Sequence, residues 1–314
     1  MRESPRIQMT NSIIDGIQRG KAGVGLIKAQ QVSGVTQISL MHYTYPLRLI
    51  KPRSFIHNHQ AVYMINFGGG LVSGDSIELA IDVQQNCRLS LLTQSSTKVY
   101  KRKSHSIPVA SKSLYGTQDR QDVSMQFVSA TIGRNALLAL IPEPVTCFKD
   151  ALYTQQQRFN LTLDASLILL DWYSSGRASR GESWQFDMFM SHNEVMVDGK
   201  LVFRDTVLLE DEHQDGSLVK SYAVRMGVYT CYATLVFVGQ LCVELIKDAL
   251  ESSTPQLIKR TRLSGVDELV WSASSIMDGK GAVVRAAAID VDTMRAFIHD
   301  RLRHSHGLIG TLFS

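Results

Sequence analysis

The chain has 314 residues, 44% of them hydrophobic and 20% charged, and its formal net charge is +4. This composition is typical of a folded globular protein and excludes a disordered or fibrous chain, and the scattered basic residues do not indicate nucleic-acid binding. Polar residues interrupt the longest apolar stretch, residues 228–246, and no apolar run opens the chain, so we expect no membrane span, no secretory signal and a cytoplasmic location.

Alternating apolar and polar residues dominate the first two thirds of the chain, which is the pattern of half-buried β-strands. In residues 77–83 the odd-numbered positions are apolar, whereas Glu78 and Asp82 would face the other way. Strands are expected at residues 35–41, 62–66, 77–83, 89–94, 123–127, 136–141, 159–163 and 167–172. Their short spacing favours a layered, mainly β architecture, although the sequence contains no recognisable internal repeat.

The C-terminal part of the chain begins with a hairpin signal and then becomes more helical. Asp198 and Gly199 separate two alternating runs and can adopt the positive φ angles of a two-residue turn. After Gly239 the apolar spacing fits one face of a helix of about three turns. The later elements are expected to be strands at residues 266–274 and 282–289 and a helix at residues 293–303, with Asp292 as its N-cap.

The domain organisation is expected to be simple. We predict a flexible N-terminal extension over residues 1–19, a single β-rich domain over residues 20–303 and a C-terminal tail over residues 304–314. The polar segment 102–121 is longer than most loops, so it is expected to be mobile or to form a contact element.

The glycine-rich stretch NFGGGLVSGD, residues 66–75, is the most conspicuous local feature. A phosphate-binding loop would precede a helix, and a Walker loop would also carry a Lys-Ser or Lys-Thr pair, but here a strand follows. A structural loop between strands is therefore favoured. The sequence also lacks a Gly-x-Ser-x-Gly elbow and a His-Glu-x-x-His helix. A β-rich hydrolase remains the alternative function, although it would need a nucleophile and a base that no motif reveals.

The four cysteines are too widely spaced for a zinc knuckle or a disulfide framework. Cys87, Cys231 and Cys242 lie in apolar periodic segments, so we expect buried free thiols there. Cys147 follows a proline-rich turn, and its role stays open.

A few histidines and carboxylates could contact a metal ion. His57 and His59 are two apart and could face one side of an extended segment, but two ligands alone make a weak site. The pair His304 and His306 lies near the C-terminus, and a surface or hydrogen-bonded role is favoured for all the histidines. Asp171 interrupts the apolar run LILLDW and must be solvated or paired, so it either belongs to a structural ion pair or lines a polar passage.

Several motifs in order resemble the UreD family, also called UreH, of urease accessory proteins. They are YPLRLIKPR, NFGGGLVSGD followed by LLTQSSTKVYK, LIPEPVTCFKDA, and DWYSSGRASRGESWQFD. The resemblance covers about residues 20–302 and is closest to the fungal and plant type of the family. The motif residues that carry it include Gly68, Gly69, Gly70, Gly74, Thr97, Lys98, Tyr100 and Arg177.

The resemblance implies a non-catalytic urease scaffold, a chaperone of nitrogen metabolism with a mainly β, elongated layered or β-helix-like body and a few helices, mostly in the C-terminal third. It implies a hetero-oligomer with UreF, with the GTPase UreG and with apo-urease, and no nucleic acid or membrane as partner. The chain would link the nickel-carrying GTPase complex to apo-urease and assist nickel insertion, with nickel bound only transiently. A metal-storage protein is disfavoured, because clustered ligands are absent from the sequence.

A nickel passage would need carboxylates or other ligands that bind the ion weakly and release it. The candidates are Asp75, Glu143, Asp171, Glu182, His57 and His59. Each of the carboxylates could instead accept structural hydrogen bonds, and this reading is favoured for Asp75 after its glycine-rich turn. Arg177 is expected to pair with Glu182 across a short turn.

Overall fold

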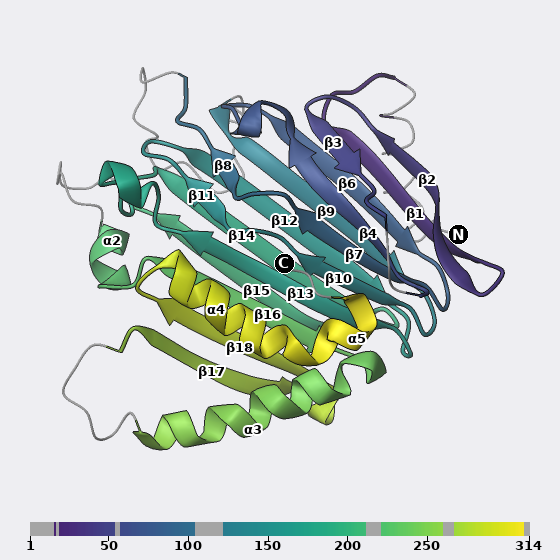
Figure 1. Cartoon of the computed structure of the whole chain (residues 1–314). Helices are drawn as coiled ribbons and strands as arrows, with labels where there is room; N and C mark the ends of the chain where they lie inside the picture. The colour runs from purple at the N-terminus through teal and green to yellow at the C-terminus, as the bar shows by residue number, and fades with distance from the viewer. Residues whose placement is uncertain are drawn as a thin grey trace.

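The computed structural model describes residues 16, 19–53, 57–103, 122–211, 221–259 and 267–310. Two β-sheets pack face to face, and helices cover the outer face of one of them (Figure 1). The expected mainly β, layered body with helices in the C-terminal third is confirmed. Most of the expected extension 1–19 and of the polar segment 102–121, together with residues 311–314 of the expected tail, lie outside the described residues.

The first sheet has seven strands in the order β15-β14-β12-β9-β6-β1-β2. Its five central strands are parallel, and β15 and β2 complete it as antiparallel edges. The strands are β1 (Val24–Val32), β2 (Val35–Tyr43), β6 (Ser76–Val83), β9 (Ser124–Ile132), β12 (Leu152–Leu161), β14 (Met188–Val197) and β15 (Lys200–Glu210).

The second sheet has eleven strands, and its main path runs β17-β18-β16-β13-β10-β7-β4-β3. The path strands are β3 (Leu47–Ile50), β4 (Gln60–Asn66), β7 (Arg88–Thr93), β10 (Leu137–Ile141), β13 (Ser166–Ser174), β16 (Cys231–Val238), β17 (Leu269–Ile276) and β18 (Gly281–Ala288). Three short strands, β5 (Gly70–Leu71), β8 (Thr97–Val99) and β11 (Val145–Cys147), pair beside this path, and β11 also joins β13.

The chain winds between the two sheets like a β-helix. It passes from β6 to β7, from β9 to β10 and from β12 to β13, each time through a turn of four residues. The equal turn lengths keep successive coils in register, so that Val83, Ile132 and Leu161 are neighbours in one sheet. Arg88, Leu137 and Ser166 are the corresponding neighbours in the other sheet.

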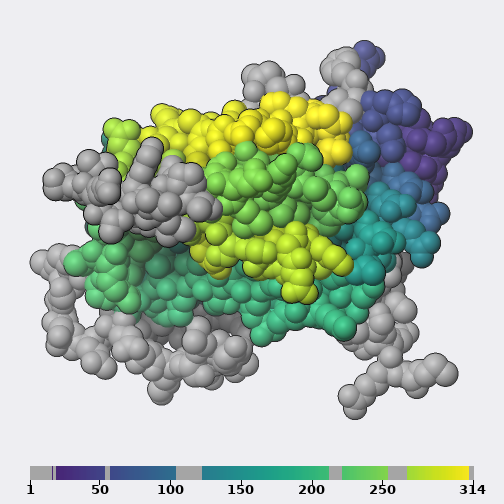
Figure 2. All heavy atoms as spheres, turned by 90° about the horizontal axis from the view of Figure 1, so that it is seen from below, coloured from purple at the N-terminus to yellow at the C-terminus, as the bar shows by residue number. Residues whose placement is uncertain are grey.

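Two apolar cores lie on the two faces of the eleven-stranded sheet. One fills the space between the sheets, and the other lies between the eleven-stranded sheet and the helices at residues 243–309. The α-helices are α2 (Ser221–Met226), α3 (Val243–Lys259), α4 (Val291–Leu302) and α5 (His306–Ile309). Short 3-10 turns are η1 (Phe67–Gly69), η3 (Ala178–Arg180), η4 (Gln240–Cys242), η5 (Met277–Gly279) and η6 (Arg303–Ser305). Figure 2 shows α3 in green between α4 in yellow and β17. In the described part of the chain no helix combines the length and apolarity of a membrane span.

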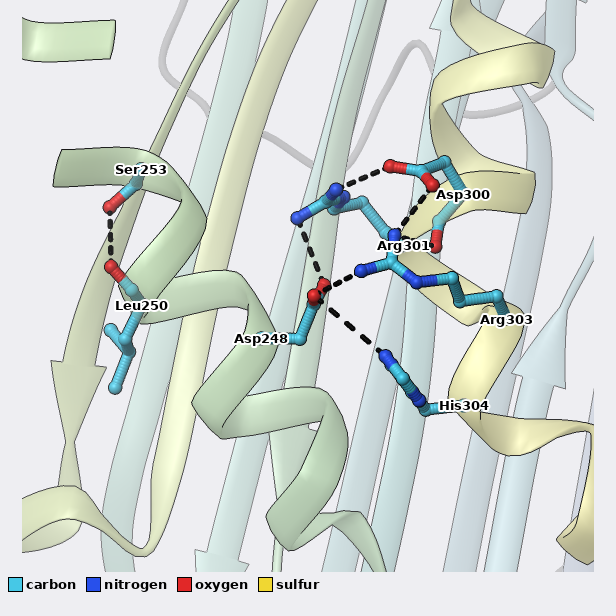
Figure 3. A network of polar contacts seen from close by, with 7 residues as sticks. All are labelled: Asp248, Leu250, Ser253, Asp300, Arg301, Arg303 and His304. Atoms are coloured by element: carbon cyan, nitrogen blue, oxygen red, sulfur yellow. Dashed lines mark hydrogen bonds and ion pairs between the residues drawn. The ribbon is translucent and has the colours of Figure 1, made fainter. Parts of the chain in front are cut away.

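A cluster of charged residues joins α3 to the C-terminal end of α4 (Figure 3). The carboxylate of Asp248 on α3 lies 3.0 Å from Nη1 of Arg301 and also pairs with Arg303. The side chains of Asp248 and Arg301 are only 13% and 8% exposed, and Arg301 also lies over the ring of Trp271. This cluster fixes the packing of the two helices.

The local predictions hold at the hairpin and fail at one helix terminus. Asp198 and Gly199 have φ angles of 46° and 76°, which confirms the predicted turn between β14 and β15. The predicted N-cap Asp292 is wrong, because Asp290 has extended backbone angles and its side chain accepts a 2.7 Å hydrogen bond from the amide of Thr293. Asp292 instead lies in the first turn of α4.

Candidate functional site

A group of polar side chains lies inside the apolar core between the two sheets. Because alternate residues of a strand face the same side, inward positions of the seven-stranded sheet should be apolar, and most of them are. At one end, however, the inward side chains are polar. These residues are Gln126 on β9, Gln155 and Gln157 on β12, and Ser191 and Asn193 on β14. The register of the sheet places Gln126, Gln155 and Ser191 in one row, so they form a continuous polar surface.

Asp171 on β13 faces this polar surface from the opposite sheet. It is only 7% exposed, and its carboxylate accepts hydrogen bonds from Gln155 Nε2 at 2.7 Å, Ser191 Oγ at 2.6 Å and Asn193 Nδ2 at 2.6 Å. Burial raises the pKa of Asp171, and these hydrogen bonds oppose that shift. All three donors are neutral, and no ion pair within the described residues includes Asp171. Of the two roles expected for it, the polar lining fits and the ion pair does not.

A cavity of about 20 Å³ lies beside Asp171, which is enough space for one water molecule. Glu143, Thr97 and Asp171 all line it, so two of the candidate carboxylates and one motif residue meet at one site. The full lining is Met64, Thr93, Thr97, Gln126, Val128, Leu140, Pro142, Glu143, Val145, Gln155, Gln157, Asp171 and Trp172.

The cavity lining is rich in hydrogen-bond acceptors. Within the described structure, the side-chain oxygens Oε1 of Gln126, Oε1 of Gln157 and Oδ1 of the nearby Asn193 are buried without a hydrogen-bond partner. Buried acceptors without donors favour a bound water or cation over an empty space. Apart from the thioether of Met64, the lining offers oxygen ligands without imidazole or thiolate. Such a lining would hold a divalent cation through hard ligands and would bind nickel less strongly than imidazole or thiolate ligands would.

Glu143 connects this cavity to the helical layer. Its Oε2 atom lies 2.8 Å from Nη2 of Arg295 on α4, and its amide donates to Thr93 Oγ1 at 2.7 Å. The indole of Trp172 donates to the carbonyl of Pro142 at 2.7 Å, which fixes the loop before Glu143. The Glu143 side chain, which is part of the cavity lining, is 18% exposed.

Asp75 and Glu182 have structural partners away from this cavity. Asp75 accepts a 2.9 Å hydrogen bond from the amide of Val72, as favoured from its turn. Glu182 accepts a 2.8 Å hydrogen bond from Nε of Arg177, which confirms the predicted pair. The Arg177 guanidinium lowers the pKa of Glu182, so this carboxylate is charged and already paired.

The two candidate histidines are in different environments. His57 is exposed, whereas His59 is 3% exposed and its Nε2 lies 2.9 Å from Ser90 Oγ. Burial, with a smaller contribution from Arg88, lowers the pKa of His59 to about 4. Cys147 and the other three cysteines are buried free thiols. Among the described residues, no three His, Cys, Asp or Glu side chains are grouped to hold a metal ion.

The sequence motifs come together beside the cavity. The short strands β5, β8 and β11 pair with one another, so the glycine-rich stretch, the Thr-Lys-Val-Tyr segment and the Pro-Glu-Pro segment are neighbours. Tyr100 donates to the carbonyl of Gly68 at 3.4 Å and packs edge-on against Phe148 at 5.1 Å. The guanidinium of Arg177 lies 4.0 Å from the centre of the Phe148 ring. These motif residues hold the loops around the cavity in place.

The inward polar side chains of β9, β12 and β14 were absent from the sequence-based candidates. Their signal is present in the sequence, since Gln126, Gln155, Gln157, Ser191 and Asn193 occupy alternate positions that would otherwise be apolar. Only the pairing of the three strands shows that the five side chains share one surface.

Comparison with known proteins identifies the family. The sequence model described as "UreD urease accessory protein" matches residues 19–309. "Urease accessory protein D" of Arabidopsis thaliana is 33% identical over 91% of this chain and 97% of its own length. "Urease accessory protein UreD" of Sorangium cellulosum is 36% identical over 93% of this chain and 83% of its own length. "Urease accessory protein 4" of Cryptococcus neoformans is 30% identical over 89% of both chains. These relatives from a plant, a bacterium and a fungus are named accessory proteins rather than enzymes, and the chain belongs to the UreD family of urease accessory proteins.

Proposed function

We propose that this chain is a scaffold that links the nickel-carrying GTPase UreG, together with UreF, to apo-urease and assists nickel insertion. Nickel is the cargo, which the chain binds only transiently. Membership of the UreD family supports the urease role. The acceptor-lined cavity between Glu143 and Asp171 is the observation that supports passage of a cation.

The chemistry of the cavity suits transit rather than storage. Asp171 offers a carboxylate without a cationic partner in the described structure, and neighbouring amide oxygens can replace part of a hydration shell. A site without imidazole or thiolate ligands holds nickel weakly, so it can release the ion to a stronger site in urease. The four buried free thiols fit a reducing compartment, and we place the protein in the cytoplasm.

The first test is urease activity in cells that contain urease and the other accessory proteins but lack this chain. Restoring the wild-type chain should restore activity and the nickel content of purified urease. Asp171→Asn and Glu143→Gln remove a negative charge from the cavity with little change of volume, so both activity and nickel content should fall several-fold.

The matched control is Asp164→Asn, because the Asp164 side chain is 58% exposed and lies in a turn outside the cavity lining. Circular dichroism melting verifies that each variant is folded. If urease matured with either cavity variant has the wild-type nickel content, the cavity is not a nickel passage. If the wild-type chain does not restore urease activity, the proposed urease role is wrong.

A further inference from the structure

The glycine-rich stretch also places the ring of Phe67 on the surface, beside the ring of Tyr45. Phe67 is 44% exposed and Tyr45 is 71% exposed, and their ring centroids are 5.6 Å apart. The guanidinium of Arg48 lies 5.7 Å from the centre of the Phe67 ring. Tyr45, Arg48 and Phe67 are called the aromatic patch below. Single exposed apolar residues are common, but two neighbouring rings, tilted by 41°, beside a cation form a built surface.

The backbone holds this patch in a fixed position. The amide of Phe67 donates to the carbonyl of Pro46 at 2.9 Å, which ties the loop to the segment that carries Tyr45. Gly68 and Gly69 have φ angles of 77° and 76°, and a β-carbon at either would meet no atom within 4 Å. The two glycines therefore make the turn and leave the adjacent ring uncovered. Gly70 packs against β8, where a β-carbon would lie 2.4 Å from the Lys98 carbonyl.

The chain segment that carries the aromatic patch has only basic charges up to Asp75, which accepts a hydrogen bond from the Val72 amide. Residues 16–74 contain no aspartate or glutamate, but they contain six basic residues. Lys21 pairs with Glu78, and Lys28 is opposite Asp82 in the sheet. The other four are Arg19, Arg48, Lys51 and Arg53, all of them exposed. Lys98 is also exposed, on the strand that pairs with Gly70. This segment is more basic than the whole chain, whose net charge is only +4.

We propose that the aromatic patch binds an acidic segment of a partner protein in the urease maturation assembly. This inference rests on the proposed function. Carboxylates of that segment pair with Arg48 and its basic neighbours, while an apolar side chain packs on Tyr45 and Phe67. Rigid aromatic residues and arginine with charged groups at the rim are the usual composition of protein binding hot spots. A nucleic acid would need a longer row of cations along its phosphates than this patch provides.

The test measures binding of the purified full-length chain to apo-urease, to UreF and to UreG, separately and in the assembled complex, at low and high salt. Phe67→Ser removes a ring, and the double variant Arg48→Glu with Lys51→Glu reverses the charge. We expect each variant to weaken binding to at least one partner about tenfold or more. The wild-type affinity for that partner should fall as salt increases.

The controls are Leu163→Ser and Lys200→Glu. Leu163 is 61% exposed and lies in the turn after β12, at the end of the parallel strands opposite the glycine-rich stretch. Lys200 is exposed in the hairpin between β14 and β15. Both controls should bind like the wild type. If Phe67→Ser fails to fold, the charge-reversal variant still tests whether the patch binds a partner, because it changes only exposed side chains.

The inference is overturned if the patch variants bind all three partners with wild-type affinity, or if the controls lose as much affinity. Binding of a single-stranded oligonucleotide that the patch variants abolish, with protein binding intact, would also overturn it. Urease activity separates this inference from the proposed function. If the patch variants bind normally and restore activity as the wild type does, only the docking surface is disproved. If the wild-type chain restores no activity, the maturation role itself is disproved.

Discussion

Asp171 and Glu194 are both nearly buried carboxylates, but their surroundings shift their pKa values in opposite directions. Asp171 lies inside the core, where burial raises its pKa and its neutral hydrogen-bond donors oppose that shift. Glu194 lies on the outer side of the seven-stranded sheet, where Arg158 and Arg204 lie 2.6 Å and 2.7 Å from its carboxylate oxygens. The hydrogen bonds from Arg158 contribute most to lowering the pKa of Glu194 to about 2. Asp171 has only neutral hydrogen-bond donors, whereas Glu194 is paired with two arginines.

Glu194 should make the free energy of unfolding depend on pH in acid. Its folded-state pKa is depressed, so its stabilisation is present above the ordinary value of 4.5 and is lost as pH falls toward about 2. In Glu194→Gln we expect lower stability at neutral pH and a shallower loss between these two values. Urea unfolding across the acid range measures both effects, with the exposed Glu251→Gln as control. Parallel pH profiles for Glu194→Gln and the wild type would contradict the assignment.

The individual site residues could be predicted from sequence only in part. Asp171 could be identified because a buried carboxylate in an apolar run needs hydrogen-bond partners or water. The pair of Arg177 and Glu182 could be identified because it spans a short turn. The glutamines of β9 and β12 were not identifiable as a group. Their meeting depends on the register of strands far apart in the sequence, which no local pattern encodes.

At the scale of elements, α4 shows how a helix terminus is decided by backbone geometry. Asp290 and Asp292 are both possible N-caps by composition, but only Asp290 has an extended backbone and an oxygen near the amide of Thr293. The length of helix α3 was also underestimated from the sequence. It has 17 residues, whereas the apolar spacing indicated about three turns, because its second half continues through the polar run Ser252, Ser253 and Thr254 and through Pro255.

The N-cap assignment predicts a difference between two similar substitutions. Asp290→Ala should lower the free energy of unfolding by about 1 kcal/mol, since it removes the acceptor for the Thr293 amide. Asp292→Ala should cost a few tenths of that, because it removes only a favourable first-turn charge and an ion pair to Arg295 in which the Asp292 side chain is 95% exposed. Chemical denaturation of both variants compares them directly. Equal losses would show that Asp290 does not cap α4.

At the scale of the whole molecule, the coils repeat in space but not at a fixed interval in sequence. Val83, Ile132 and Leu161 occupy equivalent places, yet they are separated by 49 and then 29 residues. A search for a constant period therefore finds nothing, although the turns before β7, β10 and β13 have the same length. The layered β class followed from alternation alone, whereas the winding required the pairing of distant strands.

The equal turns predict a strong sensitivity to insertion. One glycine inserted between Asn135 and Ala136 should lengthen the central turn, break its match with the turns on both sides and lower the melting temperature by several degrees. The same insertion after Gly34, in the exposed turn of the edge hairpin β1–β2, should cost less because only one strand pair adjoins it. Thermal melting followed by circular dichroism makes the comparison. A similar loss at both positions would contradict the importance of equal turns.

The strand β13 has cores on both sides, and this restricts how its sequence can change. All nine of its residues are buried. Leu167 and Leu169 contact the core between the sheets, and Ile168 and Leu170 contact the core under the helices. A substitution on either side must preserve side-chain volume, because both cores are closely packed and a larger side chain cannot turn out into solvent. The sequence of this strand should therefore change slowly among related proteins even at positions with no functional role, and slow change alone is a poor guide to function there.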